Sequence, residues 1–345
     1  MNIGDLPNPK AAADLIRAFQ KRFSTKQCMA PMHDCQGSVI SAHTLSVEGM
    51  LRPIARNGHV YAVGTDLYSK DKNEHSSLVL KGIRDTSVFN GFCQKHDRDL
   101  FAPIETVPFI CSPEQCFLYA CRAAAKECYL KRKQAENLPL PETIKAIHGL
   151  PDDVELQLSE FALMHQAASL RGAEDVERIK AKLDEIYLQK DWRRLCTTVI
   201  PFTEKPRLTC NFQYAPDFDF QGNYLQNFED TSADLSHLMI TVFSSGAGGF
   251  ALLSHLDTAN SAPANLIASL LGQTDITSAL VWLIACQTEN FALSPDWYDA
   301  LDEQTKKAFT DAFRSNINPT NVTINQLKGF SLSVPSWLPQ KPFSI

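Results

Sequence analysis

Phe92-Cys93-Gln94-Lys95-His96-Asp97 is the stretch that decides the fold of the N-terminal part of this chain. Its cysteine and histidine are three positions apart, and on a helix side chains with that spacing share one face. Structural zinc sites take four Cys or His ligands in a tetrahedron, usually supplied as two close pairs. The stretch therefore predicts one half of a zinc site.

A second pair of ligands comes from Cys28 and Cys35, which flank a loop that contains Pro31. Their separation of seven positions is wider than in the usual cysteine pair, so His33 is an alternative ligand. Lone cysteines are commonly small buried side chains, which is the competing interpretation. A structural zinc ion contributes about 10 kcal/mol to a small domain with little core. We predict one zinc ion held by Cys28, Cys35, Cys93 and His96.

The composition is that of an ordinary globular protein. The chain has 345 residues, of which 44% are apolar and 21% charged, enough for two or three domains. A formal net charge of -6 argues against a protein that coats nucleic acid through bulk electrostatics. Residues 1–105 nevertheless carry 13 Lys and Arg against 11 Asp and Glu, which permits a local contact with phosphates.

The sequence also predicts a compartment. The first residues lack the basic stretch and apolar run of an export signal, and no apolar run is long enough to span a membrane. The ten cysteines are then expected to be reduced thiols, either buried or bound to metal. We predict a cytoplasmic protein that does not bind a membrane.

Hydrophobic periodicity and helix-end signals predict an α+β protein. A lead-in helix is expected within residues 1–27, and residues 69–75 are expected to form a hairpin loop. Strands are predicted at 39–43, 59–63, 78–83, 208–214, 238–243 and 250–253. Helices are predicted at 112–135, 152–170, 174–192, 263–271, 276–285 and 294–314. Gly172 predicts a helical hairpin, and alternation of apolar and polar residues at 208–214 predicts a half-buried strand.

The order of these features resembles a treble-clef zinc finger, in which a cysteine pair and strands precede a helix that carries the last two ligands. Within that group the chain resembles the HNH, or ββα-metal, endonucleases. The matching residues are Cys28, Cys35, Ser41-Ala42-His43-Thr44-Leu45-Ser46 and Phe92-Cys93-Gln94-Lys95-His96-Asp97. Ala42 stands where the family commonly has an aspartate, and 50 positions separate His43 from Cys93.

The resemblance implies roles for two more residues. His43 would be the general base, and Asp97 would bind Mg²⁺ or Mn²⁺ where the family usually has a histidine. The competing interpretations are a core histidine or spare zinc ligand for His43, and a solvated helix residue for Asp97. Six basic residues are candidates for a phosphate-binding face: Arg52, Arg56, Lys81, Arg84, Lys95 and Arg98.

The resemblance also suggests a division of the chain. After the lead-in helix, residues 28–108 would form the treble-clef domain and residues 109–192 a helical segment. Residues 193–345 would form an α+β domain of unknown role, available to a protein partner or a second copy. The implied function is a metal-dependent nuclease that hydrolyses DNA or RNA, with structural Zn²⁺, suited in bacteria to phage defence or a mobile element. The alternative is a non-catalytic zinc module that binds nucleic acid or a protein.

Overall fold

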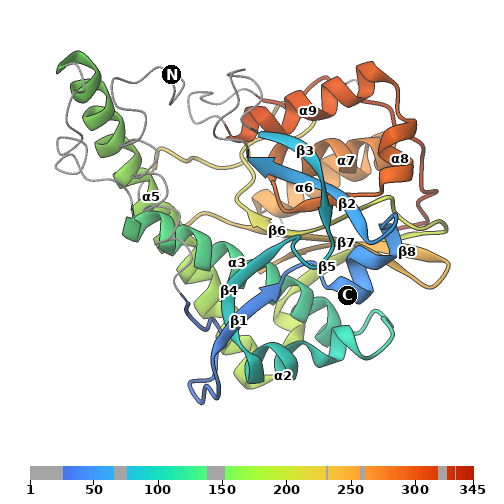
Figure 1. Ribbon diagram of the computed structural model, residues 1–345, viewed down its shortest axis with the longest axis horizontal. Coiled ribbons are helices and arrows are strands. Elements are labelled where there is room, and N and C mark those ends of the chain that lie inside the picture. The colour runs from blue at the N-terminus through green and yellow to red at the C-terminus, as the bar shows by residue number, and fades with distance from the viewer. Residues whose placement is uncertain are drawn as a thin grey trace.

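The computed structural model describes residues 26–65, 76–137, 152–230, 232–256, 261–317, 325–330 and 332–345. The protein is mixed α/β with two antiparallel sheets in these ranges (Figure 1). The predicted loop at 69–75 and almost all of the predicted lead-in helix lie outside the described residues. Among the described helices, none is long and apolar enough to cross a membrane.

The smaller sheet is a two-stranded ribbon. Strand β1 (Val39–His43) pairs antiparallel with β4 (Val88–Cys93), which places His43 opposite Val88 and Val39 opposite Cys93. Helix α2 (Gln94–Glu105) begins directly after β4 and packs on the ribbon, with Phe92 and Phe101 in edge-to-face contact. The predicted strand at 39–43 is confirmed. The ribbon and α2 together form a ββα unit.

The larger sheet has eight strands in the order β10-β5-β8-β7-β6-β9-β2-β3. Its strands are β2 (His59–Thr65), β3 (Ser76–Gly82), β5 (Cys196–Phe202), β6 (Leu208–Tyr214), β7 (Leu238–Ser245), β8 (Gly248–His255), β9 (Phe291–Leu293) and β10 (Phe343–Ser344). Strand β2 pairs with β9, with Tyr61 opposite Leu293. The chain between the two ribbon strands therefore belongs to the other sheet. The division at residues 108 and 192 stays a prediction.

Helices cover both faces of the larger sheet (Figure 1). One face packs on α3 (Pro113–Asn137), on which α5 (Asp152–Gln189) packs in turn. The other face packs on α6 (Ala262–Leu271), α7 (Ile276–Gln287), α8 (Pro295–Ala300) and α9 (Glu303–Ile317). The predicted helices at 112–135, 263–271 and 276–285 are confirmed. The prediction that β6 is half-buried is wrong, because α3 covers its polar side: Thr209, Asn211 and Gln213 are all buried.

Two helix boundaries were also predicted wrongly. Residues 152–189 form one helix, so the expected break near Gly172 does not occur. Glycine in a helix costs about 1 kcal/mol relative to alanine, which the apolar stripe of α5 offsets by packing on α3. The predicted helix at 294–314 is instead two helices, α8 and α9.

Asn290, just before β9, joins the ribbon to the larger sheet. Its side-chain amide donates to Thr44 Oγ1 at 2.9 Å and to the Asn211 carbonyl at 2.6 Å. Its Oδ1 accepts from Ser87 Oγ at 2.6 Å. Thr44 follows β1 and Ser87 precedes β4, so a single amide holds the end of the ribbon that carries His43.

Candidate metal centre

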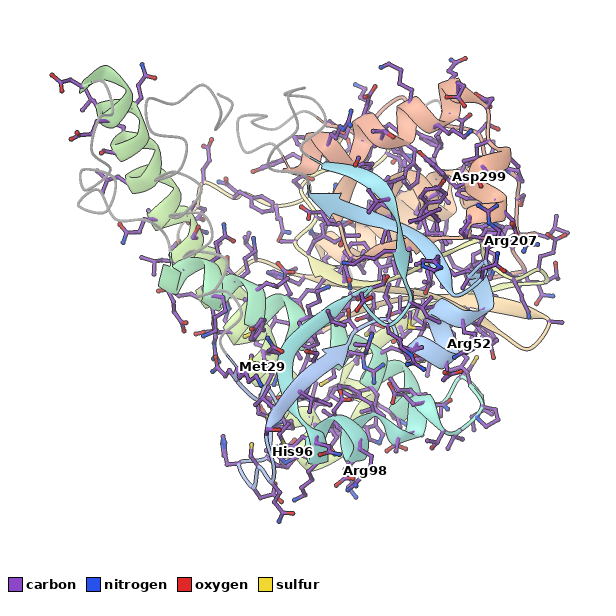
Figure 2. The ribbon with its side chains drawn as sticks, in the orientation of Figure 1. Met29, Arg52, His96, Arg98, Arg207 and Asp299 are labelled. Carbon is purple, nitrogen blue, oxygen red and sulfur yellow. The ribbon has the colours of Figure 1, made fainter. Side chains whose placement is uncertain are left out.

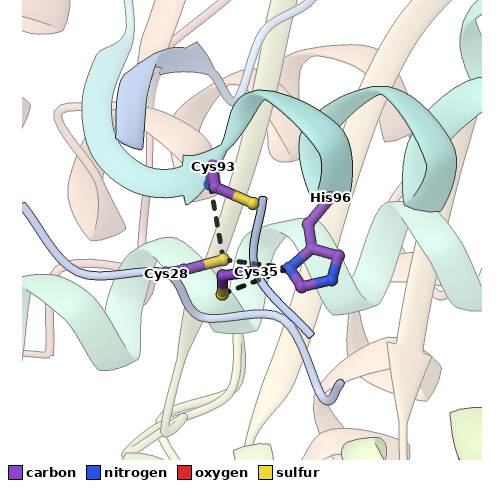
Figure 3. Close-up of side chains that lie close together, drawn as sticks. All are labelled: Cys28, Cys35, Cys93 and His96. Atoms are coloured by element: carbon purple, nitrogen blue, oxygen red, sulfur yellow. Dashed lines mark hydrogen bonds between the residues drawn. The ribbon is translucent and has the colours of Figure 1, made fainter. Parts of the chain in front are cut away.

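Four side chains form a cluster that can hold a metal ion (Figure 3). The ligand atoms of Cys28, Cys35, Cys93 and His96 all lie within 4.8 Å of one another. Cys28 and Cys35 come from the loop before β1, Cys93 ends β4, and His96 lies in the first turn of α2. The structure brings together the four residues that the sequence predicted as ligands, and His33 is not part of the cluster.

Backbone hydrogen bonds hold the cysteine loop against β4. The amide of Met29 donates to the Gly91 carbonyl at 2.8 Å, and the amide of Gln27 donates to the Asn90 carbonyl at 3.1 Å. The loop therefore extends alongside β4 and carries Cys28 to within 3.3 Å of the Cys93 amide, which donates to its sulfur. Met29 is buried at the same place, so apolar packing and hydrogen bonding both fix the loop.

Asp34 orients the histidine of the cluster. His96 Nδ1 lies 3.3 Å from Cys28 Sγ and 3.6 Å from Cys35 Sγ, whereas Nε2 lies 2.9 Å from Asp34 Oδ1. Because a carboxylate only accepts, Nε2 carries the proton and Nδ1 is left to bind an ion. Hydrogen bonds from Lys95 and then His96 lower the pKa of Asp34 to about 2. Sequence reasoning missed Asp34, although an acid directly before a ligand cysteine was a usable signal.

The thiols of the cluster differ in acidity. Burial raises the pKa of Cys28 to about 11. Burial also acts to raise the pKa of Cys93, but hydrogen bonds from the backbone of His96 and Gln36 outweigh it, and the pKa lies below its ordinary value. Only the thiolate binds metal, so binding displaces protons. Metal affinity should therefore increase with pH in the range where the thiols still carry protons.

Asp34→Asn is expected to weaken metal binding by about tenfold to a hundredfold, since an amide holds the His96 N–H less strongly than a carboxylate does. Competition with a chromophoric chelator measures the change. Asp99→Asn is the matched control, because Asp99 is exposed on α2 and bonds to Arg98. Equal affinities in the two variants would contradict the role assigned to Asp34.

His43 lies at the end of β1, partly exposed, with Nε2 at 3.0 Å from the Arg84 carbonyl. A carbonyl only accepts, so Nε2 is the protonated nitrogen and Nδ1 carries the lone pair in the neutral ring. Within the described residues Nδ1 has no hydrogen-bond partner. The residue is therefore neither in the metal cluster nor enclosed in the core.

Asp97 is half-buried in the first turn of α2. Burial raises the pKa of its carboxyl group, and the charge of Arg122 opposes this rise. The charge of Glu105 adds to the rise, and that of His43 opposes it. Arg122 is almost fully buried, lies 4.0 Å from the centre of the Phe101 ring, and pairs with Glu105 at 2.6 Å.

Four of the six candidate phosphate-binding residues form ion pairs. Arg52 pairs with Glu48, Arg56 with Asp296 and Asp299, Lys95 with Asp34, and Arg98 with Asp99. Figure 2 shows Arg98 beside His96, whereas Arg52 lies towards the larger sheet and Asp299 on α8. Lys81 and Arg84 form no ion pair within the described residues. The six therefore do not form one continuous basic face.

Comparisons of the chain with protein-family models, with curated proteins and with solved structures give no match.

Proposed function

We propose that this protein is a metal-dependent nuclease of the HNH type, acting on DNA or RNA in the cytoplasm. The observation that supports the proposal best is the ββα unit, with a Cys₃His cluster at the junction of β4 and α2 and with His43 at the opposite end of the ribbon. Asp97 follows the last cluster residue on α2. All ten cysteines are free, which fits a reducing compartment.

The cluster is proposed to hold structural zinc. Three sulfurs and one imidazole nitrogen are soft and borderline donors, which favour Zn²⁺ over Mg²⁺ or Ca²⁺. Four protein ligands fill a tetrahedron and leave no position for water or substrate. On this proposal the cluster fixes α2 against the ribbon, and the chemistry takes place elsewhere.

His43 is proposed as the general base. Its Nε2–H is held by the Arg84 carbonyl, so the ring is oriented and Nδ1 is available to take a proton from an attacking water. The residues on either side of the ribbon end are held by Asn290 through Thr44 and Ser87, which limits movement of the ring. A base that removes a proton from water needs this fixed position.

Asp97 is proposed as a ligand for the catalytic Mg²⁺ or Mn²⁺. A carboxylate is a hard oxygen ligand suited to either ion. The bound ion would neutralise charge on the scissile phosphate and on the leaving oxygen. The partial burial of Asp97 limits how many waters compete for its oxygens.

Cleavage of supercoiled plasmid and of single-stranded RNA by the zinc-loaded protein, with added Mg²⁺ or Mn²⁺, tests this function. Asp97→Asn is expected to lower the cleavage rate by about a hundredfold, because the ion loses its protein ligand. Asp99→Asn, two positions along the same helix, is the matched control and should cleave normally. A folded, zinc-bound wild type that binds nucleic acid and cleaves neither substrate would instead support the non-catalytic zinc module.

A further inference from the structure

A cavity of about 1110 Å³ lies between α3, α5 and the polar side of β6. Strands β2 and β3 and residues 287–291 complete its wall. This volume is slightly above the range of about 300–1,000 Å³ typical of pockets for small organic molecules. The cavity takes residues from the beginning, the middle and the end of the chain, so it exists only in the fully folded protein.

The floor of the cavity contains buried polar side chains with unused hydrogen-bonding capacity. Asn211, Gln213 and His237 are 0%, 3% and 6% exposed. Gln213 Nε2 donates to His237 Nδ1 at 3.0 Å, which leaves the histidine proton on Nε2. Asn211 Oδ1, Gln213 Oε1 and His237 Nε2 have no partner in the described residues. An unpartnered buried polar atom costs about 1–3 kcal/mol, so this floor is suited to a polar occupant.

Among the described charged side chains of the wall, Glu289 and two lysines form no ion pair. Lys131 pairs with Glu127, and Arg171 with Asp175, each at 4.0 Å. Lys81 and Lys126 also line the cavity and form no ion pair or hydrogen bond within the described part of the chain.

Lys126 is half-buried in the wall of the cavity, and this burial affects its pKa. Burial lowers its pKa to about 8, an effect that Glu127 and Glu289 oppose and that the charge of Lys81 reinforces. Both lysines line the same cavity, Lys81 from β3 and Lys126 from α3. A dianion bound in this cavity would offer charge to both lysines.

We infer that this cavity is a binding site for a small organic phosphate, held by Lys81 and Lys126 at the phosphate and by the amide floor at the polar body. A phosphate dianion matches two unpaired lysines, whereas a carboxylate would match one. The cavity is larger than inorganic phosphate needs, and the side chains of the floor supply acceptors and a donor for hydroxyl or amide groups. The cavity wall includes Ser87 and Val88 at the ribbon end that carries His43, but neither His43 nor Asp97 is among the residues that line it, and the inference does not depend on cleavage.

Acylation of individual lysines in the full chain, measured by mass spectrometry after a short pulse of acetic anhydride at pH 7, tests the inference. Phosphate bound beside Lys126 should raise the pKa of Lys126 and so lower the fraction of free amine, which is the form that reacts. A tenfold change in the protonation equilibrium should slow acylation by about tenfold. Inorganic phosphate is the first probe, and sodium chloride of equal ionic strength is the reference. Lys182, exposed on α5 and outside the cavity, is the internal control.

The expected result is protection of Lys126 by inorganic phosphate with Lys182 unchanged, and protection by glucose 6-phosphate at a lower concentration than inorganic phosphate. Equal slowing of both lysines, or no slowing of Lys126, would overturn the inference. Equal protection by the two probes at equal concentration would assign the site to free phosphate and overturn the organic ligand. Lys126→Gln should also abolish the rise in melting temperature produced by phosphate, whereas Lys182→Gln should keep it.

Discussion

On the proposal that the cluster holds structural zinc, Cys93→Ser is expected to release the ion and to unfold the ββα unit. Structural zinc contributes about 10 kcal/mol in small zinc domains, which is comparable to the whole stability of an ordinary globular domain. Cys93 joins β4 to α2 and is itself buried, so its loss removes a ligand at the point where the strand passes into the helix. Elemental analysis should give one zinc per chain in the wild type and much less in the variant, with a large loss of thermal stability.

Cys196→Ser is the matched control, because Cys196 is exposed on β5 and far from the cluster in sequence. It should keep both zinc and stability. A strong chelator added to the wild type should reproduce the effect of Cys93→Ser, since both remove the ion. If either Cys93→Ser or the chelator-treated wild type lost its zinc and kept the stability of the untreated wild type, the result would contradict a structural metal. It would favour ordinary buried thiols.

His43→Ala is expected to lower the cleavage rate by about a hundredfold to ten-thousandfold, the range that a positioned general base contributes. Zinc content and melting temperature should stay near the wild-type values, because His43 is partly exposed and outside the Cys₃His cluster. The rate should be measured on supercoiled plasmid under single-turnover conditions, so that it reports the chemical step.

His59→Ala is the control for this measurement. His59 is an exposed histidine at the start of β2 that bonds to the backbone of Asn57. Its variant should cleave like the wild type. Equal rates for His43→Ala and the wild type would remove His43 from the mechanism even if Asp97→Asn were inactive.

Local patterns in the sequence were sufficient to locate the metal cluster and the first strand of the ribbon, whereas β4 was not predicted and Cys93, expected on a helix, ends that strand. The Cys93 and His96 spacing is set by one helical turn, and the ribbon strand at 39–43 is short and rich in β-forming residues. Both signals depend on neighbours in the chain. The pairing of Cys28 and Cys35 with that helix was inferred from coordination chemistry rather than from periodicity.

The features that could not be predicted depend on residues far apart in the chain. The polar side of β6 looked solvent-facing, because nothing in residues 208–214 reveals that α3 covers it and that Asn211 donates to the Tyr119 carbonyl at 3.0 Å. The membership of β2 in the larger sheet depends in the same way on β9, more than 200 positions later. Asp34 has a local signal, its place directly before Cys35, but its hydrogen bond to His96 joins residues 62 positions apart.

The pairing of β2 with β9 has a consequence for synthesis on the ribosome. All four cluster residues have been translated by residue 96, whereas β9 begins at residue 291. At a translation rate of about 5–20 residues per second, that interval lasts on the order of ten to forty seconds. Throughout it, β2 has an unpaired edge able to associate with other nascent chains. Zinc bound early would keep β1 and β4 together while the β2–β3 hairpin has no partner strand. Recombinant expression in zinc-poor medium should therefore direct more of the protein into inclusion bodies.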